Sequence, residues 1–223
     1  MTNDPSVAHD HALHHDHDHD HDHDHDHDHD PPAAPDDQHS PATGPVADAS
    51  ARIARPNDAA AVGRVQAAVW RAAYGEVLPQ EVVDQFEPAS FARIWRDSLK
   101  NPPSPRHVLL VACAGEQIVG FVAVGPSTDR DATETSGEVL ALGVHPEARR
   151  SGHGSRLLNA AVDTLRGKGF RSMAVWLLAR DEQTRAFLTA AGLSPDSAYR
   201  DRVIDADGTI VREVRLTADL ARE

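Results

Sequence analysis

A glycine-rich segment in the second half of the chain has the residue types and spacing of an anion-binding loop. The motif Arg149-x-x-Gly152-x-Gly154 follows an apolar run and precedes a stretch with helical periodicity. Glycines let backbone N–H groups turn toward a phosphate, and the N-terminus of the following helix adds the positive end of its dipole. Arg149 and Arg150 can add charge-assisted hydrogen bonds. The motif therefore predicts a phosphate-binding loop, with an unliganded glycine-rich turn as the alternative.

This loop differs from two common nucleotide-binding motifs. It contains no Gly-Lys-Ser or Gly-Lys-Thr, which a Walker A motif requires. It also lacks the first glycine of the dinucleotide fingerprint Gly-x-Gly-x-x-Gly. The segment is therefore neither a Walker A loop nor a dinucleotide-binding turn.

A second group of chemically active residues lies near the N-terminus, where His-Asp is repeated eight times from His15 to Asp30. In an extended chain, alternate residues project the same way, so the imidazoles form one row and the carboxylates another. Neutral imidazole is a common ligand of zinc, nickel and copper, and nearby carboxylates favour a dication. The repeat predicts loose, multivalent zinc or nickel binding, with a passive solubilising extension as the alternative. The predicted ligands are His15, His17, His19, His21, His23, His25, His27 and His29. A catalytic metal centre is not expected, because that needs rigidly held ligands with an open position.

Charge and hydrophobicity divide the chain into two parts. The net charge is −13, yet the first 51 residues hold 13 aspartates and no Lys or Arg, so the remaining residues are formally neutral. The first part also has few large apolar residues and several prolines, and such a segment cannot bury enough apolar surface to order itself. We therefore expect a disordered His/Asp-rich tail with a Pro-rich linker over 1–51, and a single domain over 52–223.

The composition also excludes several classes of protein. No apolar run approaches the roughly 18 residues that span a bilayer, and no secretory signal precedes the tail. A neutral domain behind an acidic tail argues against nucleic-acid binding, which needs a basic face. The single cysteine, Cys113, fits a reducing compartment. We expect a cytoplasmic protein that binds neither nucleic acid nor membrane.

The elements that must position the loop follow from apolar periodicity and turn residues. Helices are expected after Asn57 and Asp58, over 87–99, after the glycine-rich loop and over 183–191. Asp205-Ala-Asp-Gly208 is expected to be a hairpin turn. The expected strands cover 51–55, 108–113, 118–124, 138–144, 173–178, 198–204 and 210–216. This order predicts a mixed sheet with helices on both faces.

At this point the sequence resembles the GCN5-related N-acetyltransferase (GNAT) superfamily. Leu142-Gly-Val144-x-Pro146, which leads into the arginine and glycine motif, resembles the acetyl-coenzyme A motif of that family. The resemblance extends over 52–220. It is supported by Phe187-x-x-x-x-Gly192-Leu193, which resembles the final-helix signature, and by Trp70-x-x-x-Tyr74, Leu78-Pro79 and Trp95, which resemble small bacterial members.

The resemblance implies an α/β (α+β) fold with a mixed, mostly antiparallel sheet of six to seven strands, and transfer of an acetyl group from acetyl-CoA to the primary amine of a small molecule. In this family the fourth and fifth strands splay apart around the pantetheine arm, and a backbone N–H, here near Val144, polarises the thioester carbonyl. The implied cofactor-binding residues are Leu142, Gly143, Val144, Arg149, Arg150, Ser151, Gly152, His153, Gly154 and Ser155.

The implied reaction also needs a group that takes a proton from the attacking amine. Glu138, on the fourth expected strand, is the candidate base, directly or through water, with His145 as a second possibility. Two positions depart from the family. Leu188 stands where the family's common tyrosine protonates the departing thiolate, and Asp181 replaces a frequent asparagine. Tyr74 and Tyr199 remain as tyrosines that could approach the site.

These departures keep other functions open. Leu188 motivates a sensor that binds acyl-CoA or an enzyme of weak activity. The His-Asp repeat motivates a metal-buffering protein for which the domain is a carrier. The main expectation is an acetyl-CoA-dependent N-acetyltransferase with a small amine acceptor and no catalytic metal, acting as a monomer or homodimer.

Overall fold

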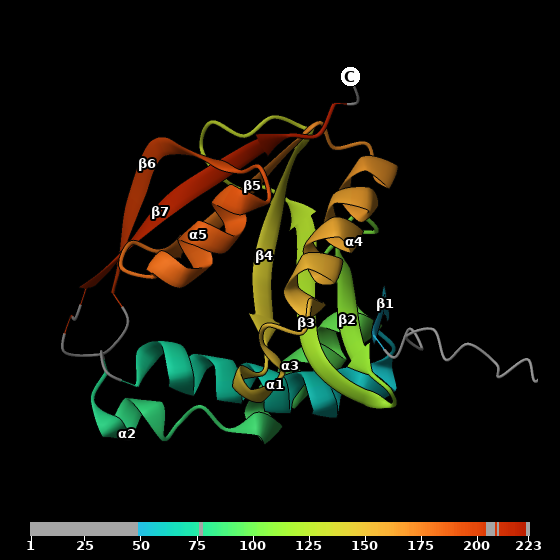
Figure 1. Cartoon of the computed structure of the whole chain (residues 1–223), viewed down its shortest axis with the longest axis vertical. Helices are drawn as coiled ribbons and strands as arrows, with labels where there is room; N and C mark the ends of the chain where they lie inside the picture. Colours follow the sequence, from blue (N-terminus) through green and yellow to red (C-terminus); the bar gives the residue numbers. More distant parts are fainter. Residues whose placement is uncertain (1–48, 76–77, 204–207, 209, 222–223) are drawn as a thin grey trace, which may run out of the picture. The chain divides into compact units, whose positions relative to one another are not determined.

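A computed structural model describes residues 49–75, 78–203, 208 and 210–221, all of which lie in one unit of the chain (Figure 1). In these residues seven strands form one sheet in the order β1-β2-β3-β4-β5-β7-β6. Neighbouring strands are antiparallel, except that β4 and β5 are parallel. The strands are β1 (Ala49–Ile53), β2 (Val108–Ala114), β3 (Gln117–Pro126), β4 (Ser136–Val144), β5 (Ser172–Leu178), β6 (Ser194–Val203) and β7 (Ile210–Asp219).

In the same described residues five α-helices accompany the sheet: α1 (Ala59–Tyr74), α2 (Gln80–Val83), α3 (Pro88–Lys100), α4 (His153–Gly167) and α5 (Glu182–Ala190). Leu157, Leu158 and Leu165 of α4, together with Leu188 of α5, pack on one face of the sheet. The helices α1 and α3 cover the other face, where Val62 packs against strand residues of β2 and β3. The predicted mixed sheet with helices on both faces is confirmed, and the strand count lies within the predicted range.

The expected and observed elements differ mainly at their ends and in the short segments. The first strand begins at Ala49, two residues before its expected start, and α2 is one helical turn that the sequence did not indicate. The strand β6 begins at Ser194 because a register shift between Pro195 and Tyr199 accommodates a loop-like sequence within the strand. Of the expected 205–208 turn, all but Gly208 lies outside the described residues.

Candidate active site

The two parallel strands at the centre of the sheet separate partway along their length. Pairing between β4 and β5 runs from Ser136 and Ser172 to Val139 and Val175, although β4 continues to Val144 and β5 to Leu178. On its other side β4 stays paired with β3, with a register shift between Ala123 and Val124. The backbone of β4 beyond Val139 is thus paired with β3 alone, and we call the unpaired region between the ends of β4 and β5 the opening.

Helix α1 lies against the end of β4 on one face of the sheet. A Cβ atom at Gly143 would lie 3.2 Å from Val69 of α1 and 2.9 Å from the ring of Phe121, so the glycine allows the helix to approach β4 closely. Beyond the end of β5, the guanidinium of Arg180 donates a 3.2 Å hydrogen bond to the carbonyl of Ala73, in the last turn of α1. The C-terminal half of α1 therefore touches the end of β4 and the segment that follows β5.

The first turn of α4 borders the opening on the opposite face. A Cβ atom at Gly154 would lie 3.4 Å from the ring of Phe187 on α5 and 3.9 Å from a methyl group of Val144. The start of α4, the middle of α5 and the end of β4 thus meet at one place. Phe187, in the expected final-helix signature, contributes to this meeting point.

The glycine-rich loop connects the end of β4 to α4. The backbone has positive φ at Arg150 (64°) and at Gly152 (78°), and α4 begins at His153. The guanidinium of Arg149 donates to the carbonyl of Val144 at 3.3 Å, which holds the loop against the strand. The predicted cofactor-binding residues therefore form one continuous path: Leu142, Gly143 and Val144 on β4, Arg149, Arg150, Ser151 and Gly152 in the loop, and His153, Gly154 and Ser155 in the first turn of α4.

His153, the first residue of α4, is buried. Its side chain is 5% exposed, and its Nδ1 atom has no hydrogen-bond partner among the described residues. Burial lowers the pKa of the imidazole, and the neighbouring Arg156 lowers it further. The neutral form is therefore favoured at neutral pH, so His153 offers a hydrogen-bonding nitrogen rather than a positive charge.

These features fit the diphosphate end of acetyl-CoA. A left-handed residue followed by a helix N-terminus presents successive N–H groups to one side. At Gly152 φ is 78°, a conformation that L side chains rarely adopt, so glycine is favoured at this position. The buried nitrogen of His153 is a polar atom that the protein leaves without a partner. The glycine-rich loop and the first turn of α4 thus fit the diphosphate of acetyl-CoA that the sequence analysis predicted there.

Glu138 lies on β4 immediately before the pairing with β5 ends. It is 7% exposed, and it accepts a 3.1 Å hydrogen bond from the hydroxyl of Ser127. Because the next residue, Val139, packs in the core on the side of α4, strand alternation directs Glu138 to the opposite face. Burial raises the pKa of its carboxyl, whereas the Ser127 hydrogen bond opposes that rise.

The other residues that sequence analysis singled out are less suited to proton transfer. The ring of His145 accepts a 3.4 Å hydrogen bond from the backbone of Glu147, and it helps to shape the turn after β4. Leu188 is fully buried in the core, and its alkyl side chain has no ionisable proton to donate. Asp181 caps α5 by accepting a hydrogen bond from the backbone of Thr184.

The two tyrosines have different surroundings. Tyr199 is 63% exposed on β6, where the guanidinium of Arg212 lies 4.7 Å from its ring centre. Tyr74 ends α1 and packs edge-on against Trp70 with ring centres 5.8 Å apart. Burial raises the pKa of the Tyr74 phenol, with a further contribution from the charge of Glu213, so this phenol keeps its proton at neutral pH. Tyr74 is thus the tyrosine whose helix borders the opening.

Sequence analysis did not identify Ser127 as a residue of the site. It lies in the loop between β3 and β4, where its residue type does not distinguish it from its neighbours. The pairing of Gly125 with Glu138 brings this loop back over the carboxylate. A correct strand register would have been the signal needed to find it.

The described part of the chain also bears on metal binding and on membrane insertion. Within it, no group of three or more His, Cys, Asp or Glu residues could hold a metal ion. The eight histidines of the predicted metal-binding repeat lie outside the described residues. Within the same described ranges, no helix has the length and apolar character needed to cross a membrane.

Comparison with known proteins bears on the same segment. Residues 67–193 match the Acetyltransferase (GNAT) family, a region that includes β4, the glycine-rich loop and α4. The chain is also 26% identical over 166 residues to the uncharacterised N-acetyltransferase YuaI of Bacillus subtilis, which covers 74% of this chain and 90% of that protein.

Solved structures with the same fold include two that contain the cofactor. One is PaiA N-acetyltransferase from Thermoplasma acidophilum in complex with coenzyme A, at a TM-score of 0.58 and 15% identity, covering 77% of this chain and 98% of that one. Another is the acetyltransferase YncA from Salmonella typhimurium with acetyl-CoA, at a TM-score of 0.58 and 16% identity, covering 78% of this chain and 95% of that one. At these identities the likeness shows a shared fold. Because the family match spans more than half of the chain, this protein belongs to the GNAT family and is an acetyl-CoA-dependent N-acetyltransferase, as its sequence predicted.

Proposed function

We propose that the protein acetylates the primary amine of a small molecule by direct attack on acetyl-CoA in a ternary complex, with Glu138 as the general base. The observation that carries this proposal is the position of Glu138. A buried carboxyl with a raised pKa lies one residue before the point where β4 and β5 separate. A carboxylate in that position is next to the opening into which the family's acetyl donor extends.

The glycine-rich segment binds the donor in this proposal. The backbone of Leu142, Gly143 and Val144 pairs with the pantetheine arm, and the N–H groups of 150–155 hold the pyrophosphate. When bound, acetyl-CoA supplies an acetyl group activated as a thioester. A backbone N–H of the unpaired part of β4 polarises the carbonyl oxygen of that thioester, which favours attack at its carbon.

Glu138 accepts the proton that the attacking amine must lose. An aliphatic amine is mostly protonated at neutral pH and is then not nucleophilic. General bases work best when their pKa lies near the operating pH. Burial moves the pKa of the Glu138 carboxyl in that direction, which supports its assignment as base.

The departing thiolate has no obvious proton donor at the position where the family commonly has tyrosine. Leu188 fills the core and cannot supply one. A thiolate is a tolerable leaving group, because thiol pKa values are only about 8.5. We therefore expect turnover without a residue that protonates the thiolate. If such a residue is sought, Tyr74 is the first tyrosine to replace.

A panel of small amines with acetyl-CoA, assayed by release of free CoA, tests the proposed function. We expect turnover with at least one amine of the panel, and loss of that turnover in Glu138→Gln with CoA affinity retained. Tight CoA binding without turnover of any amine would instead support a sensor that binds acyl-CoA.

A second, separable function is proposed for the tail. The eight consecutive His-Asp pairs favour loose binding of zinc or nickel ions through imidazole nitrogens. This function involves none of the residues of the acetyl-CoA site, and the two are testable independently.

A further inference from the structure

The environment of Glu138 includes a chain of hydrogen bonds that reaches across the sheet to Arg215 on β7. We propose that Ser127 is a positioning residue for Glu138, and that Arg215 holds Ser127 in place by fixing Asp129 and the loop that carries it. This inference rests on the proposed role of Glu138 as base. It assigns a catalytic purpose to residues that do not touch the predicted acetyl-CoA segment.

The first link joins Ser127 to Glu138. Ser127 follows β3, and its backbone N–H donates a 2.9 Å hydrogen bond to the carbonyl of Ser136, which closes the neck of the loop. Its Oγ atom accepts the backbone N–H of Asp129 at 3.3 Å and donates to Oε2 of Glu138 at 3.1 Å. Because the N–H of Asp129 occupies a lone pair of the hydroxyl, the hydroxyl proton is directed to the carboxylate.

The second link fastens Asp129 to two strands on the far side of the opening. Oδ2 of Asp129 accepts a 3.1 Å hydrogen bond from the indole N–H of Trp176 on β5. The same oxygen accepts a 2.9 Å hydrogen bond from the guanidinium of Arg215 on β7. The side chain of Asp129 is only 14% exposed, so these charge-assisted contacts lie partly out of water.

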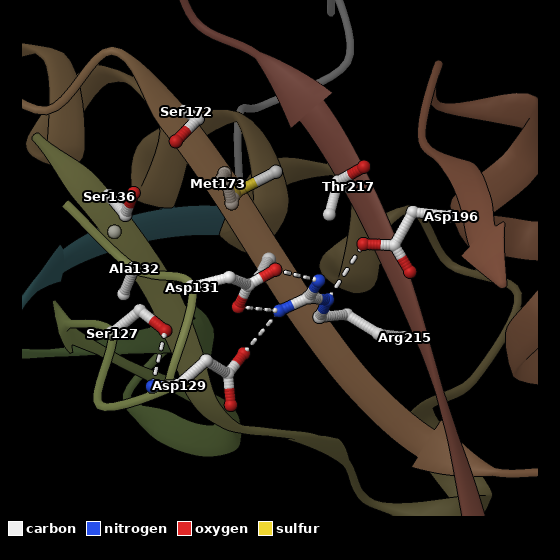
Figure 2. Close-up of a pocket in the computed structure, with 12 residues that line it drawn as sticks. Ser127, Asp129, Asp131, Ala132, Ser136, Ser172, Met173, Asp196, Arg215 and Thr217 are labelled. Atoms are coloured by element: carbon white, nitrogen blue, oxygen red, sulfur yellow. Dashed lines mark hydrogen bonds and ion pairs between the residues drawn. The ribbon is translucent and has the colours of Figure 1, made fainter. Parts of the chain in front are cut away.

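Arg215 binds three carboxylates at once (Figure 2). In addition to Asp129, it forms a two-pronged pair with Asp131, at 2.7 and 2.6 Å, and a 2.7 Å contact with Asp196 of β6. These hydrogen bonds raise the pKa of Arg215 above its ordinary value and lower that of Asp131 to about 2, so the groups stay charged at all working pH values. The guanidinium, 12% exposed, thereby ties the β3–β4 loop to β6 and β7.

The arrangement differs from an ordinary surface ion pair. A single exposed pair contributes little, whereas a network of partly buried charges with fork geometry fixes the positions of its members. Arg215, Asp129 and Ser127 line one cavity of about 180 Å³ (Figure 2). We call the contacts of Arg215 with Asp129, Asp131 and Asp196 the clamp. The neighbouring space would let the β3–β4 loop move if these contacts were lost.

Two charged groups act on Glu138 besides the Ser127 hydroxyl. Asp129, on the loop, raises the pKa of the Glu138 carboxyl by repulsion, and Arg200, on β6, lowers it. Arg200 itself lies with its guanidinium 4.2 Å from the ring centre of Trp176 and is paired with Glu213 at 2.6 Å. Against this balance, the hydrogen bond from Ser127 favours the ionised carboxylate, which is the form that accepts a proton.

Removing the Ser127 hydroxyl therefore has a definite sign. The hydrogen bond stabilises the charged form of Glu138, so Ser127→Ala raises the pKa of that carboxyl further. The base then stays protonated to higher pH. In the rising part of the pH profile we expect kcat to fall about three- to tenfold in Ser127→Ala, with convergence toward the parent at high pH and an unchanged KM for acetyl-CoA.

The test follows Glu138 in two ways in the full-length protein. Its carboxyl is titrated by carbon-13 NMR, with Glu138→Gln to assign the signal, and kcat is measured against pH. Ser127→Ala should shift both titrations upward, whereas Ser127→Thr, which keeps the hydroxyl, should restore the parental curves. Ser136→Ala is the matched control, because it removes a hydroxyl at the start of β4 that contacts Thr133 and not Glu138.

Arg215→Lys tests the clamp, because lysine keeps the charge but cannot make the fork. We expect the same upward shifts of the Glu138 titration and of the kcat profile, with folding checked by thermal unfolding. If this variant does not fold, the Ser127 variants still test the hydrogen bond to Glu138. An unchanged titration of Glu138 in Ser127→Ala would overturn the proposal. If Ser127→Ala shifts the NMR titration while Glu138→Gln keeps the parental kcat, the positioning hydrogen bond stands and the assignment of Glu138 as base fails.

Discussion

Val139 on β4 and Val175 on β5 form the last pair before these parallel strands separate. Both side chains pack in the core that α4 and α5 cover, so the point of separation is fixed by buried apolar contacts. Glu138 precedes Val139 and faces the other side of the sheet. Val139 thus anchors β4 in the core on one face of the sheet, and its neighbour Glu138, the candidate base, lies beside the opening on the other face.

Gly152→Val should weaken CoA binding at least tenfold. Gly152 has φ of 78°, a backbone conformation that costs a β-branched residue about 1–2 kcal/mol, whereas the nearby Arg156 guanidinium is the end of a flexible side chain and can move. The loop must either shift or carry this strain, and both disturb the N–H groups that hold pyrophosphate. Calorimetric titration with CoA measures the loss.

Gly169→Val is the matched control for that substitution. Gly169 also has a positive φ, 82°, but a Cβ atom there would have no neighbour within 4 Å, and the residue follows the opposite end of α4. It should lower thermal stability to a similar degree and leave CoA affinity unchanged. Equal CoA affinities for the parent and Gly152→Val would contradict the cofactor assignment of the loop.

Glu138→Gln should lower kcat by on the order of 10²-fold and abolish its dependence on the titration of this carboxyl. Because burial raises the pKa of Glu138, the carboxyl of the parent is protonated and inactive as a base at low pH. The parental kcat therefore rises as pH increases through that pKa, and the variant lacks this limb. Steady-state kinetics from pH 5 to 9, with CoA affinity measured in parallel, test the assignment.

Glu134→Gln provides the control for charge alone. Glu134 is exposed in the β3–β4 loop, and the substitution removes one carboxylate while leaving the residues beside the opening unchanged. Its pH profile should superimpose on that of the parent. A parental kcat in Glu138→Gln at every pH would leave proton removal to water.

Asp58→Asn should reduce the free energy of unfolding by about 1 kcal/mol at pH 7. Arg52 of β1 donates two hydrogen bonds, of 2.6 and 3.0 Å, to the Asp58 carboxylate just before α1, and the backbone of Arg55 adds a third, of 2.7 Å. These contacts hold the pKa of Asp58 below its ordinary value, the Arg52 bond having the largest effect. Chemical denaturation measures the difference.

The sign of the pH dependence follows from that lowered pKa. The stabilisation is fully present above the unfolded-state value of about 3.9 and is lost as pH falls through the lower folded-state value. The parent and Asp58→Asn should therefore converge in stability in strong acid. Asp201→Asn, which breaks the exposed pair with Arg212, should have no measurable effect at either pH.

The strands and long helices were predictable because their signal is local. The apolar runs in β2, β3 and β5 and the helical stripe of α4 carry enough hydrophobic residues to define them in isolation. The glycine-rich loop was predictable for the same reason, since Gly152 marks a positive φ and the adjoining strand and helix are both recognisable. The ends of β1 and β6 and the single turn α2 depend on partners elsewhere, so the sequence placed them wrongly or missed them.

The contact between Arg215 and Asp129 had no local signal in the sequence. Arg215 and Asp129 are 86 residues apart, and they meet only because β7 pairs with β5 while the β3–β4 loop turns over the same face. Leu188 illustrates the opposite case. The sequence identified it as a departure from the family, and its complete burial explains why an apolar residue is stable there.

The His-Asp repeat should bind several zinc ions at pH 7.5 and few at pH 5. Imidazoles with ordinary pKa values near 6.5 are mostly neutral ligands at the higher pH and mostly protonated at the lower one. A matched variant with the eight histidines of the repeat replaced by asparagine keeps the carboxylates and should lose the binding. This comparison assigns the metal to imidazole rather than to the aspartates.

Deleting residues 1–48 tests whether the tail and the domain act independently. The cut is placed before Ala49 because β1 begins there and pairs with β2, so a longer deletion would remove part of the sheet. Since none of the predicted acetyl-CoA residues belongs to the repeat, the deletion should keep the parental CoA affinity with and without zinc. Multisite zinc binding should appear in the full-length protein alone. Equal zinc binding by the deleted protein at pH 7.5 would place the metal site in the domain and refute the assignment to the tail.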